Sequence, residues 1–325
     1  MTPYIDMHCD TLMKAWMKGK KDLFQLKNTM TDVQRLQAGG CRAQFFAIFL
    51  LPVTLKKKLG PFFPKDETYI AKLCGIYQNT LQRHPGQIGP ALSCAQLEQN
   101  AAAGRLSGVL TMEDGRAVAG RLENLDRFYQ MGVRVLGLTW NHANCFGAPN
   151  AADEQTMAQG LTAFGKESIA YMNQLGMGID VSHLSDGGFW DVARLSQKPF
   201  FATHSNCRAL NPHPRSLTDE MIRALAEKGG VMGLNFGPQF LTADTKCKDS
   251  RIDAMLAQLR HMVKVGGIGC AAIGTDFDGV SGNMQIASAS EMPLLFEAME
   301  QAGFTADEIE TIACKNVQRV LREVL

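Results

Sequence analysis

Long apolar runs, paired cysteines and an excess of charge of either sign are all missing from this 325-residue sequence. No stretch reaches the roughly 18 uninterrupted apolar residues that a membrane-spanning helix needs. The nine cysteines are odd in number and form no Cys-x-x-Cys pair, which argues against a disulfide framework and against a structural zinc site of that kind. A formal net charge of +1 gives no global field that would attract nucleic acid or an anionic membrane. We therefore predict neither nucleic-acid nor membrane partners.

Targeting and nucleotide-binding signals are missing as well. The N-terminus shows no charged segment followed by a long apolar one, so no signal peptide is expected. Together with the scattered cysteines, this predicts a cytoplasmic protein. No Gly-x-Gly-x-x-Gly follows the first apolar run, which disfavours a dinucleotide-binding fold.

What the sequence does contain is a repeated alternation of short apolar runs and longer amphipathic segments. The segment Thr218 to Lys228, for example, carries apolar residues at helical spacing. Strands that alternate with helices predict a parallel sheet, and eight such units on this length favour a (β/α)8 TIM-type barrel. The eight expected strands are Tyr4 to Met7, Cys41 to Leu51, Gly108 to Met112, Val133 to Trp140, Met177 to Val181, Pro199 to Ala202, Val231 to Phe236 and Cys270 to Gly274.

Local signals divide the rest of the chain. Ser216 and Thr305, each followed three residues later by an acidic residue, are predicted helix N-caps, and Gly229-Gly230 is predicted to end a helix. The segment Pro52 to Pro64, with Lys56-Lys57-Lys58 as a solvated patch, is expected to be a loop insertion. Glu291 to Leu325 is expected to form closing helices, and residues 1–325 to form a single domain.

Polar residues follow most of the expected strands. Because side chains alternate along a strand, His8 and Asp10 should point to one side and Cys9 to the other. In a barrel of this kind, catalytic residues project from the carboxyl ends of the strands, so all these polar residues should meet at one mouth. The relevant stretches are His8-Cys9-Asp10, Glu113-Asp114-Gly115, Trp140-Asn141-His142, Ser182-His183, Thr203-His204-Ser205-Asn206 and Asp276-Phe277-Asp278-Gly279.

The mixture of imidazoles and carboxylates predicts a metal site. Four of the seven histidines fall at separate strand ends, although a lone histidine is more often a hydrogen-bonded residue at the edge of a core. Imidazole and carboxylate together suit zinc or a similar first-row metal. The ligands outnumber those that one tetrahedral ion needs, which favours two metals that share a bridging carboxylate.

These residues resemble the membrane dipeptidase (renal dipeptidase) family of zinc peptidases, within the amidohydrolase-type barrels. The similar pieces occur in the family's order and span nearly the whole chain. They are Asp6-Met7-His8-Cys9-Asp10, Thr111-Met112-Glu113-Asp114-Gly115, Gly178-Ile179-Asp180-Val181-Ser182-His183, Phe201-Ala202-Thr203-His204-Ser205-Asn206, Arg215 and Gly274-Thr275-Asp276-Phe277-Asp278-Gly279-Val280.

The resemblance implies two Zn²⁺ per chain. One ion would be held by His8, Asp10 and Glu113 and the other by Glu113, His183 and His204, with Glu113 as the bridge. Asp276 matches the family's proton-handling aspartate, and Arg215 matches the arginine that pairs with a substrate carboxylate. The family also has a histidine that steadies the tetrahedral intermediate, and either Trp140 or His142 takes its place here. The mammalian members carry a secretion signal, a membrane anchor and disulfides, none of which this sequence supports.

The expected activity is therefore hydrolysis of free dipeptides, including those with a C-terminal D-residue, by a hydroxide that two zinc ions generate. The catalytic residues would be Asp276, Glu113 and His142, and the substrate-binding residues Arg215, His142 and Asp276. Two alternatives stay open: a hydrolase of lactones, cyclic amides or phosphoesters on the same barrel, and an inactive metal-binding relative. A substrate without a carboxylate would not need Arg215. The oligomeric state is open too, with a homodimer among the options.

Overall fold

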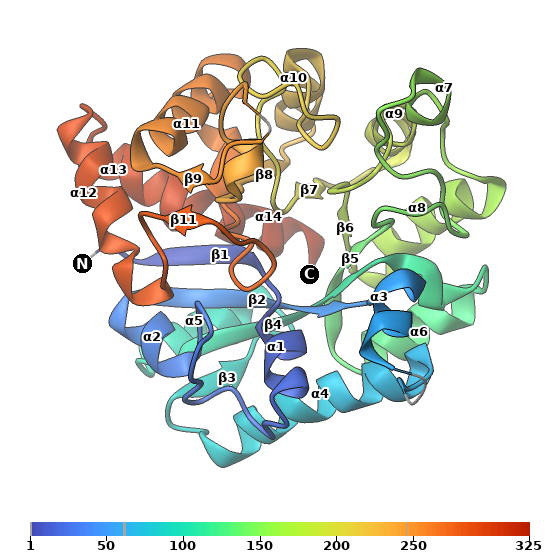
Figure 1. Ribbon diagram of the computed structural model, residues 1–325, viewed down its shortest axis with the longest axis horizontal. Helices are drawn as coiled ribbons and strands as arrows, with labels where there is room; N and C mark the ends of the chain where they lie inside the picture. The colour runs from blue at the N-terminus through green and yellow to red at the C-terminus, as the bar shows by residue number, and fades with distance from the viewer. Residues whose placement is uncertain (1, 61–62, 245) are drawn as a thin grey trace.

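Eight parallel strands close on themselves in the computed structural model, which describes residues 2–60, 63–244 and 246–325. Around the barrel the order is β2-β1-β10-β8-β7-β6-β5-β4, and β4 pairs back with β2 (Figure 1). The short strand β3 extends the sheet beside β4, and β9 pairs with β11 outside the barrel. The strands are β1 (Tyr4–Cys9), β2 (Cys41–Phe49), β3 (Ile88–Pro90), β4 (Leu106–Glu113), β5 (Val133–Gly137), β6 (Gly178–Asp180), β7 (Phe201–Ala202), β8 (Val231–Leu234), β9 (Asp249–Ser250), β10 (Ala271–Ile273) and β11 (Asn283–Met284).

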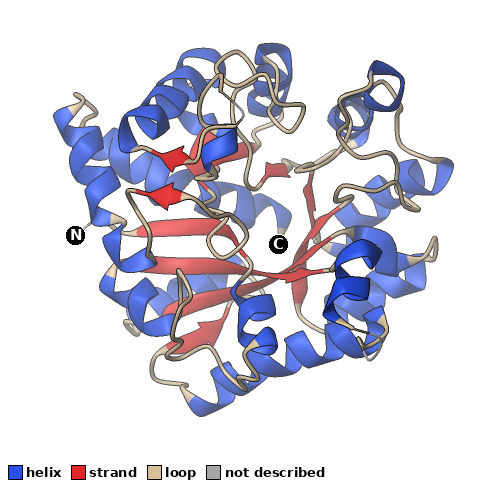
Figure 2. Cartoon of the chain, viewed as in Figure 1, coloured by secondary structure: helices blue, strands red, loops and turns tan. Residues whose placement is uncertain are grey.

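The helices surround the strands, as the blue and red segments of Figure 2 show. Within the described residues, no helix combines the length and the apolar character that crossing a membrane requires. The α-helices are α1 (Thr11–Met17), α2 (Val33–Ala38), α3 (Val53–Leu59), α4 (Asp66–Arg83), α5 (Cys94–Ala102), α6 (Leu122–Gln130), α7 (Glu154–Met157), α8 (Ala163–Leu175), α9 (Asp186–Leu195), α10 (Asp219–Glu227), α11 (Ile252–Gly266), α12 (Pro293–Gln301), α13 (Ala306–Glu310) and α14 (Asn316–Val324).

Two apolar clusters hold the barrel together. The larger one lies between the outer faces of the strands and the helices. The smaller one fills the barrel interior and includes Ile5 and Met7 of β1, Phe45 of β2 and Phe201 of β7. The last helix belongs to this inner cluster, because α14 turns Val317, Val320, Leu321 and Val324 towards the strands. That spacing places one apolar stripe along the helix, so α14 packs against the amino-terminal end of the barrel and leaves the opposite mouth to polar side chains.

The predicted strands and closing helices are confirmed. Each of the eight expected apolar runs contains or overlaps a barrel strand, and α12 to α14 occupy the expected closing segment. Thr305 caps α13 in a capping box with Glu308, and Gly229, with φ of 71°, follows the end of α10. The three-residue strand β3 was not predicted, because it is short and ends in a proline.

Two local predictions are wrong. The segment Pro52 to Pro64 is not simply a loop, because residues Val53–Leu59 form α3; residues 61 and 62 lie outside the described ranges. Leucine and lysine favour a helix there, and Pro52 precedes its first residue. The second error concerns α10, whose N-cap is Thr218 rather than Ser216. The Ser216 hydroxyl instead donates to Asn211 Oδ1, inside the loop that precedes the helix.

Candidate metal centre

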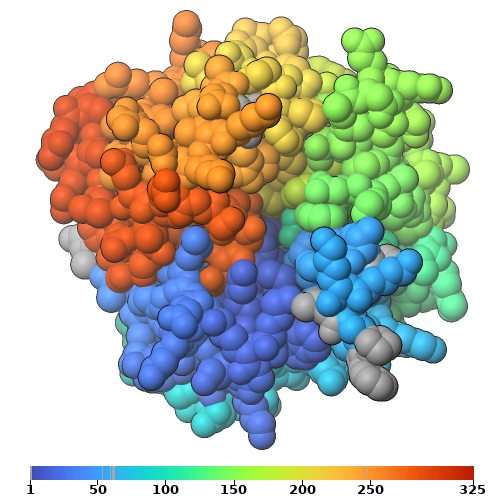
Figure 3. Space-filling view, in the orientation of Figure 1, coloured from blue at the N-terminus to red at the C-terminus, as the bar shows by residue number. Residues whose placement is uncertain are grey.

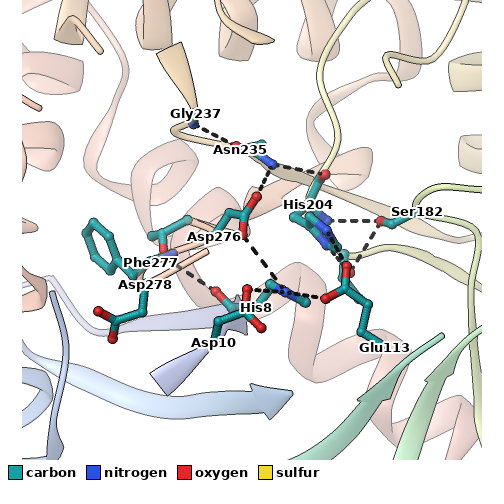
Figure 4. A network of polar contacts seen from close by, with 12 residues as sticks. His8, Asp10, Glu113, Ser182, His204, Asn235, Gly237, Asp276, Phe277 and Asp278 are labelled. Carbon is teal, nitrogen blue, oxygen red and sulfur yellow. Dashed lines mark hydrogen bonds and ion pairs between the residues drawn. The ribbon is translucent and has the colours of Figure 1, made fainter. Parts of the chain in front are cut away.

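Side chains from the ends of four strands converge at the carboxyl-terminal mouth of the barrel. His8 lies in β1, Asp10 directly follows that strand, and Glu113 is the last residue of β4. His204 follows β7 and Asp276 follows β10, and Figure 4 shows these side chains pointing towards one another. All five are buried. The strand ends therefore bring together the residues that the sequence indicated, as a parallel barrel requires.

Glu113 stands at the centre of the group. Its Oε2 atom lies 3.5 Å from His8 Nε2. Its Oε1 atom lies 3.1 Å from His183 Nε2 and 3.5 Å from His204 Nε2. Burial alone would raise the pKa of Glu113, but the charge of His8 is the largest opposing effect, and that pKa lies well below its usual range. One carboxylate thus presents a separate oxygen to each side of the site.

The two histidines on one side have their outer nitrogens occupied. His183 Nδ1 lies 2.9 Å from Asn141 Oδ1, and His204 Nδ1 lies 2.8 Å from Thr203 Oγ1. The two Nε2 atoms face each other at 3.2 Å. Burial lowers the pKa of His183 to about 4 and that of His204 well below its usual value, with the charge of Arg215 adding to both effects. Neutral rings that donate from Nδ1 direct their Nε2 lone pairs towards Glu113.

The other side is rich in carboxylates. His8 Nε2 lies 3.7 Å from Asp10 Oδ2 and 4.0 Å from Asp276 Oδ1. Burial alone would lower the pKa of His8, but Glu113 and Asp10 raise it well above its usual value. Among the described residues, His8 Nε2 and Asp10 Oδ1 are buried atoms without a hydrogen-bond partner. Buried polar atoms of this kind call for an explanation, and a bound cation supplies one.

The donor set fits divalent metal. Two groups of ligand atoms lie within 4.8 Å of one another: His8, Glu113 and His204, and His8, Asp10 and Asp276. Imidazole nitrogen with carboxylate oxygen is a donor set typical of zinc and similar first-row metals. Without a cation, the converging lone pairs and carboxylates would repel one another. A cation bound between them would turn this repulsion into attraction. Orienting partners such as Thr203 and Asn141 are also usual behind ligating histidines.

Asp276 is both a neighbour of the ligands and a titratable group. Burial is the largest effect on it and, with the negative charges of Asp10 and Glu113, raises the pKa of Asp276 to about 7, against the opposing effect of His8. The amide of Asn235 donates to Asp276 Oδ2 at 2.8 Å and fixes the carboxylate. Asn235 was not predicted. It directly follows β8, and its polar side chain inside the run Val231 to Phe236 was the signal that could have identified it.

Unusual backbone conformations accompany these residues. Asp114, His183, Asp276 and Asp278 all have positive φ, between 61° and 74°, a region that residues other than glycine rarely adopt. Gly279 is needed for a related reason. A Cβ atom at this position would lie 2.2 Å from both Asp10 Oδ2 and Asp276 Oδ1. Such local strain, concentrated at one mouth, is typical of functional sites.

A cavity of about 230 Å³ opens onto the centre. Figure 3 shows this face hollowed where the N-terminal, middle and C-terminal parts of the chain meet. Its polar wall includes Asp10, Glu113, Asn141, His183, Gln239 and Asp276, and its apolar wall includes Met13, Phe49, Trp140, Phe240 and Val280. Trp140 lies edge-on to Phe49, with ring centroids 5.1 Å apart. His142 is exposed and does not line this cavity. Its catalytic role stays a prediction from the sequence.

Arg215 is buried behind His204 rather than in the cavity wall. Its Nη1 atom donates to Ser205 Oγ and its Nη2 atom donates to the His204 carbonyl, both at 2.8 Å. Its Nε atom is buried without a partner among the described residues. Burial lowers the pKa of Arg215, although Asp180, Asp276 and Glu113 act in the opposite direction. The contact with a substrate carboxylate stays a prediction.

Several known proteins are similar to this chain in sequence or in fold. A metallopeptidase from Rhodobacter sphaeroides, solved with a phosphinate mimic of the dipeptide L-Ala-D-Ala, is 27% identical, with a TM-score of 0.89 over 99% of both chains. The dipeptidase AC structure is 28% identical, with a TM-score of 0.89 over 100% of this chain and 99% of the other. The uncharacterised protein in the pqqA 5′ region of Klebsiella pneumoniae is 34% identical over 77% of this chain and 93% of its own length.

The family assignment rests on the whole length of the sequence. The sequence profile described as membrane dipeptidase, peptidase family M19, matches residues 1–325. The matched region contains every strand end that contributes to the metal centre. The chain therefore belongs to the membrane dipeptidase family, peptidase family M19.

Proposed function

We propose that this protein is a metal-dependent dipeptidase that holds two divalent ions, with zinc as the expected metal. The observation that carries the proposal is the position of Glu113, whose two oxygens face His8 on one side and His183 and His204 on the other. His8, Asp10 and Glu113 would hold one ion, and Glu113, His183 and His204 the other. Ions bound there would lower the pKa of a water molecule from 15.7 to about 7 and polarise the scissile carbonyl.

Asp276 is proposed to move the proton. It borders the cavity and the ligand group at once, and the Asn235 amide fixes one of its oxygens. A carboxyl whose pKa is about 7 can accept a proton from the attacking water and return it to the leaving amine at neutral pH. The remaining oxygen, Oδ1, is the one that faces His8 and is therefore the atom proposed to carry the proton.

The substrate is proposed to be a free dipeptide. The solved relative with a bound mimic of L-Ala-D-Ala supports both the dipeptide and a D-residue at its C-terminal end. A cavity of about 230 Å³ suits a ligand of this size better than a long chain. Arg215 is proposed to interact with the free carboxylate, because its guanidinium is close enough to the centre to affect both His183 and His204. The cytoplasmic location and the oligomeric state stay predictions from the sequence.

The experiment combines metal analysis with a substrate screen. Protein purified without chelator should contain about two divalent ions per chain. It should hydrolyse L,L and L,D dipeptides, and the same dipeptides amidated at the C-terminus should react far more slowly. An active, zinc-supplemented preparation with one tightly bound ion at most would contradict the bridged site. Equal rates on free and amidated substrates, or a preference for lactones or phosphoesters, would replace the dipeptidase with another hydrolase of the same fold.

A further inference from the structure

Two buried aspartates outside the proposed ligand set make the same pattern of contacts at different places in the barrel. The first is Asp6 of β1. Its Oδ1 atom accepts the backbone N–H of Thr275 at 2.8 Å, and its Oδ2 atom accepts the Thr275 hydroxyl at 2.7 Å. Oδ1 also accepts the N–H of His8, at 3.3 Å. Asp6 therefore ties the end of β1 to the segment that follows β10.

The second is Asp180 of β6. Its Oδ1 atom accepts the backbone N–H of Thr203 at 2.9 Å, and its Oδ2 atom accepts the Thr203 hydroxyl at 2.6 Å. Oδ1 also accepts the N–H of Ser182, two residues further along, at 3.0 Å. We call each aspartate with its threonine an aspartate clamp: Asp6 with Thr275, and Asp180 with Thr203.

The two clamps have the same register. Asp6 pairs with Ile273 of β10, and Asp180 pairs with Phe201 of β7. In each case the threonine lies two residues beyond the paired residue. The next residue is Asp276 after one clamp and His204 after the other. Each clamp therefore fixes the backbone directly before a side chain of the centre.

The clamps differ in what the threonine hydroxyl does next. Thr203 Oγ1 faces His204 Nδ1 at 2.8 Å, whereas Thr275 Oγ1 accepts the backbone N–H of Phe277 at 3.1 Å. A hydroxyl has one proton, and the Thr203 proton goes to Asp180 Oδ2 at 2.6 Å, because a carboxylate can only accept. Ser182 Oγ, 3.3 Å from Thr203 Oγ1, is then a donor to Thr203. Thr203 can then only accept from His204, so His204 carries its proton on Nδ1. Its Nε2 lone pair is left facing Glu113.

We propose that Asp180 is a positioning residue that fixes the metal-binding tautomer of His204 through the Thr203 hydroxyl, and that Asp6 is a counterpart that fixes only backbone. The inference rests on the proposed metal site, because it explains how one ligand of that site is prepared. In this role Asp180 acts by setting the direction of the Thr203 hydroxyl proton, and not by packing.

Asp180→Asn tests the hydrogen-bond chain from Asp180 through Thr203 to His204, and it hardly changes the shape of the side chain. An asparagine can still accept both N–H groups through its oxygen, but its amide nitrogen donates to Thr203. The Thr203 proton must then point to another acceptor, either His204 Nδ1 at 2.8 Å or Ser182 Oγ at 3.3 Å. The shorter contact favours His204, whose own proton would then move to Nε2. We expect metal affinity to fall roughly 10- to 100-fold, the usual loss when an outer partner of a ligand is removed. Zinc affinity is measured by competition with a chromophoric chelator.

Asp6→Asn is the matched control. The same inversion at Thr275 meets no imidazole, so metal affinity should stay within about threefold of wild type. An equal loss in both variants would mean that the clamps are only structural, and the tautomer proposal would fail. Unchanged affinity in Asp180→Asn would overturn it as well. Wild-type protein without a metal site would instead count against the proposed function.

A second pair of variants covers the case in which Asp180→Asn does not fold. Thr203→Ser keeps the hydroxyl and should bind metal like wild type, whereas Thr203→Val removes the acceptor and should bind more weakly. Nitrogen-15 NMR of metal-free protein reads the tautomer directly and does not depend on activity. We expect His204 Nε2 to be unprotonated in wild type and protonated in Asp180→Asn. Equal affinity in the two Thr203 variants, or the same tautomer with and without Asp180, would refute the proposal.

Discussion

The two sides of the metal centre differ in how much of their geometry the protein itself provides. On the imidazole side, His183 and His204 are each oriented by a partner on Nδ1. On the carboxylate side, His8 Nε2 and Asp10 Oδ1 have no partner among the described residues. The pKa values of the histidines also move in opposite directions, down for His183 and His204 and up for His8.

This difference indicates two kinds of preparation for a cation. The imidazole side is preorganised, since neutral rings already direct lone pairs at Glu113. The carboxylate side concentrates negative charge that only a cation or a proton can balance, and His8 takes up that proton when no cation is bound. We therefore expect the two proposed ions to differ in affinity and in pH dependence.

Glu113→Gln should produce the largest loss of metal and activity, because it removes the carboxylate that faces both the imidazole side and the carboxylate side. An amide cannot supply an anionic oxygen to each side, so both ions should be lost together. Activity should fall by more than the roughly 10⁴-fold that marks the upper range for losing a general acid–base group. Elemental analysis and dipeptide hydrolysis measure both effects, with the exposed Glu123→Gln as control. Loss of one ion alone would show that the sides are independent.

Asp276→Asn should separate chemistry from metal binding on the carboxylate side. The variant should keep its metal, because the proposed ligands remain. Turnover should fall by about two to four orders of magnitude, the usual contribution of general acid–base catalysis. The metal content of the same preparation serves as the control. A metal-loaded variant with nearly full activity would show that Asp276 does not move the proton.

Arg215→Ala tests whether the imidazole side also recognises the substrate. Truncating one partner of a charge-assisted pair costs about 2–5 kcal/mol. The value of kcat/KM for a free dipeptide should therefore decrease by a factor between about thirty and several thousand. The amidated dipeptide should be affected far less.

Arg208→Ala is the control for damage to the loop that carries Arg215. Arg208 binds Asp186 and the carbonyls of Pro214 and Ser216, so its loss disturbs this loop without removing the Arg215 guanidinium. Any loss in Arg208→Ala should be equal for free and amidated substrates. Equal losses on both substrates in Arg215→Ala would mean that this arginine does not recognise the carboxylate.

The metal-free protein should show the two sides as opposite pH dependences of unfolding. Asp276, with a pKa of about 7, contributes stability that is complete below the unfolded value of about 3.9 and is lost as pH rises through 7. His183, with a pKa of about 4, contributes stability that is complete above about 6.5 and is lost as pH falls towards 4.

Urea unfolding between pH 4 and 8 with chelator present measures these terms. Relative to wild type, Asp276→Asn should gain stability as pH rises, and His183→Gln should gain stability as pH falls. If the unfolding free energies of wild type and both variants changed with pH in parallel, the opposite pKa shifts of Asp276 and His183 would be contradicted.

The smallest effect on kcat/KM is expected at His142, which belongs to neither side of the metal centre. This side chain is exposed and does not line the cavity, so His142→Ala should change kcat/KM by only about twofold. Trp140→Leu removes an aromatic wall and the contact with Phe49, and should weaken kcat/KM by roughly 2- to 12-fold. A loss of two orders of magnitude in His142→Ala would instead assign the family's intermediate-binding histidine to His142.

The sequence could predict the barrel and most of the centre, because strand alternation and residue type carry that information. His8 and Asp10 lie close together as strand alternation predicted, although Asp10 directly follows β1 and the register of β1 shifts between Asp6 and Cys9. The parallel barrel brings Glu113 and His204 to the same end. Contacts that depend on three-dimensional packing could not be predicted. Asn235 is one example, since only the structure places its amide beside Asp276. The burial of Arg215 behind His204 is another, since its position in sequence suggests an exposed helix start.

The pairing of β1 with β10 also has a consequence for how the protein folds. Asp6 and Thr275 are 269 residues apart in the sequence, and their contact holds the segment that carries Asp276 beside His8. Pairings between residues this far apart slow folding, because the loop-closure entropy of the intervening chain must be lost before the contact stabilises the fold. Ions held by His8, Asp10, Glu113, His183 and His204 would bind only the folded chain, in which these side chains from separate strands are together. They would stabilise it by about 4 kcal/mol when their concentration is a thousand times the dissociation constant. A chelator should therefore leave the protein folded but lower the urea concentration at which half of it unfolds.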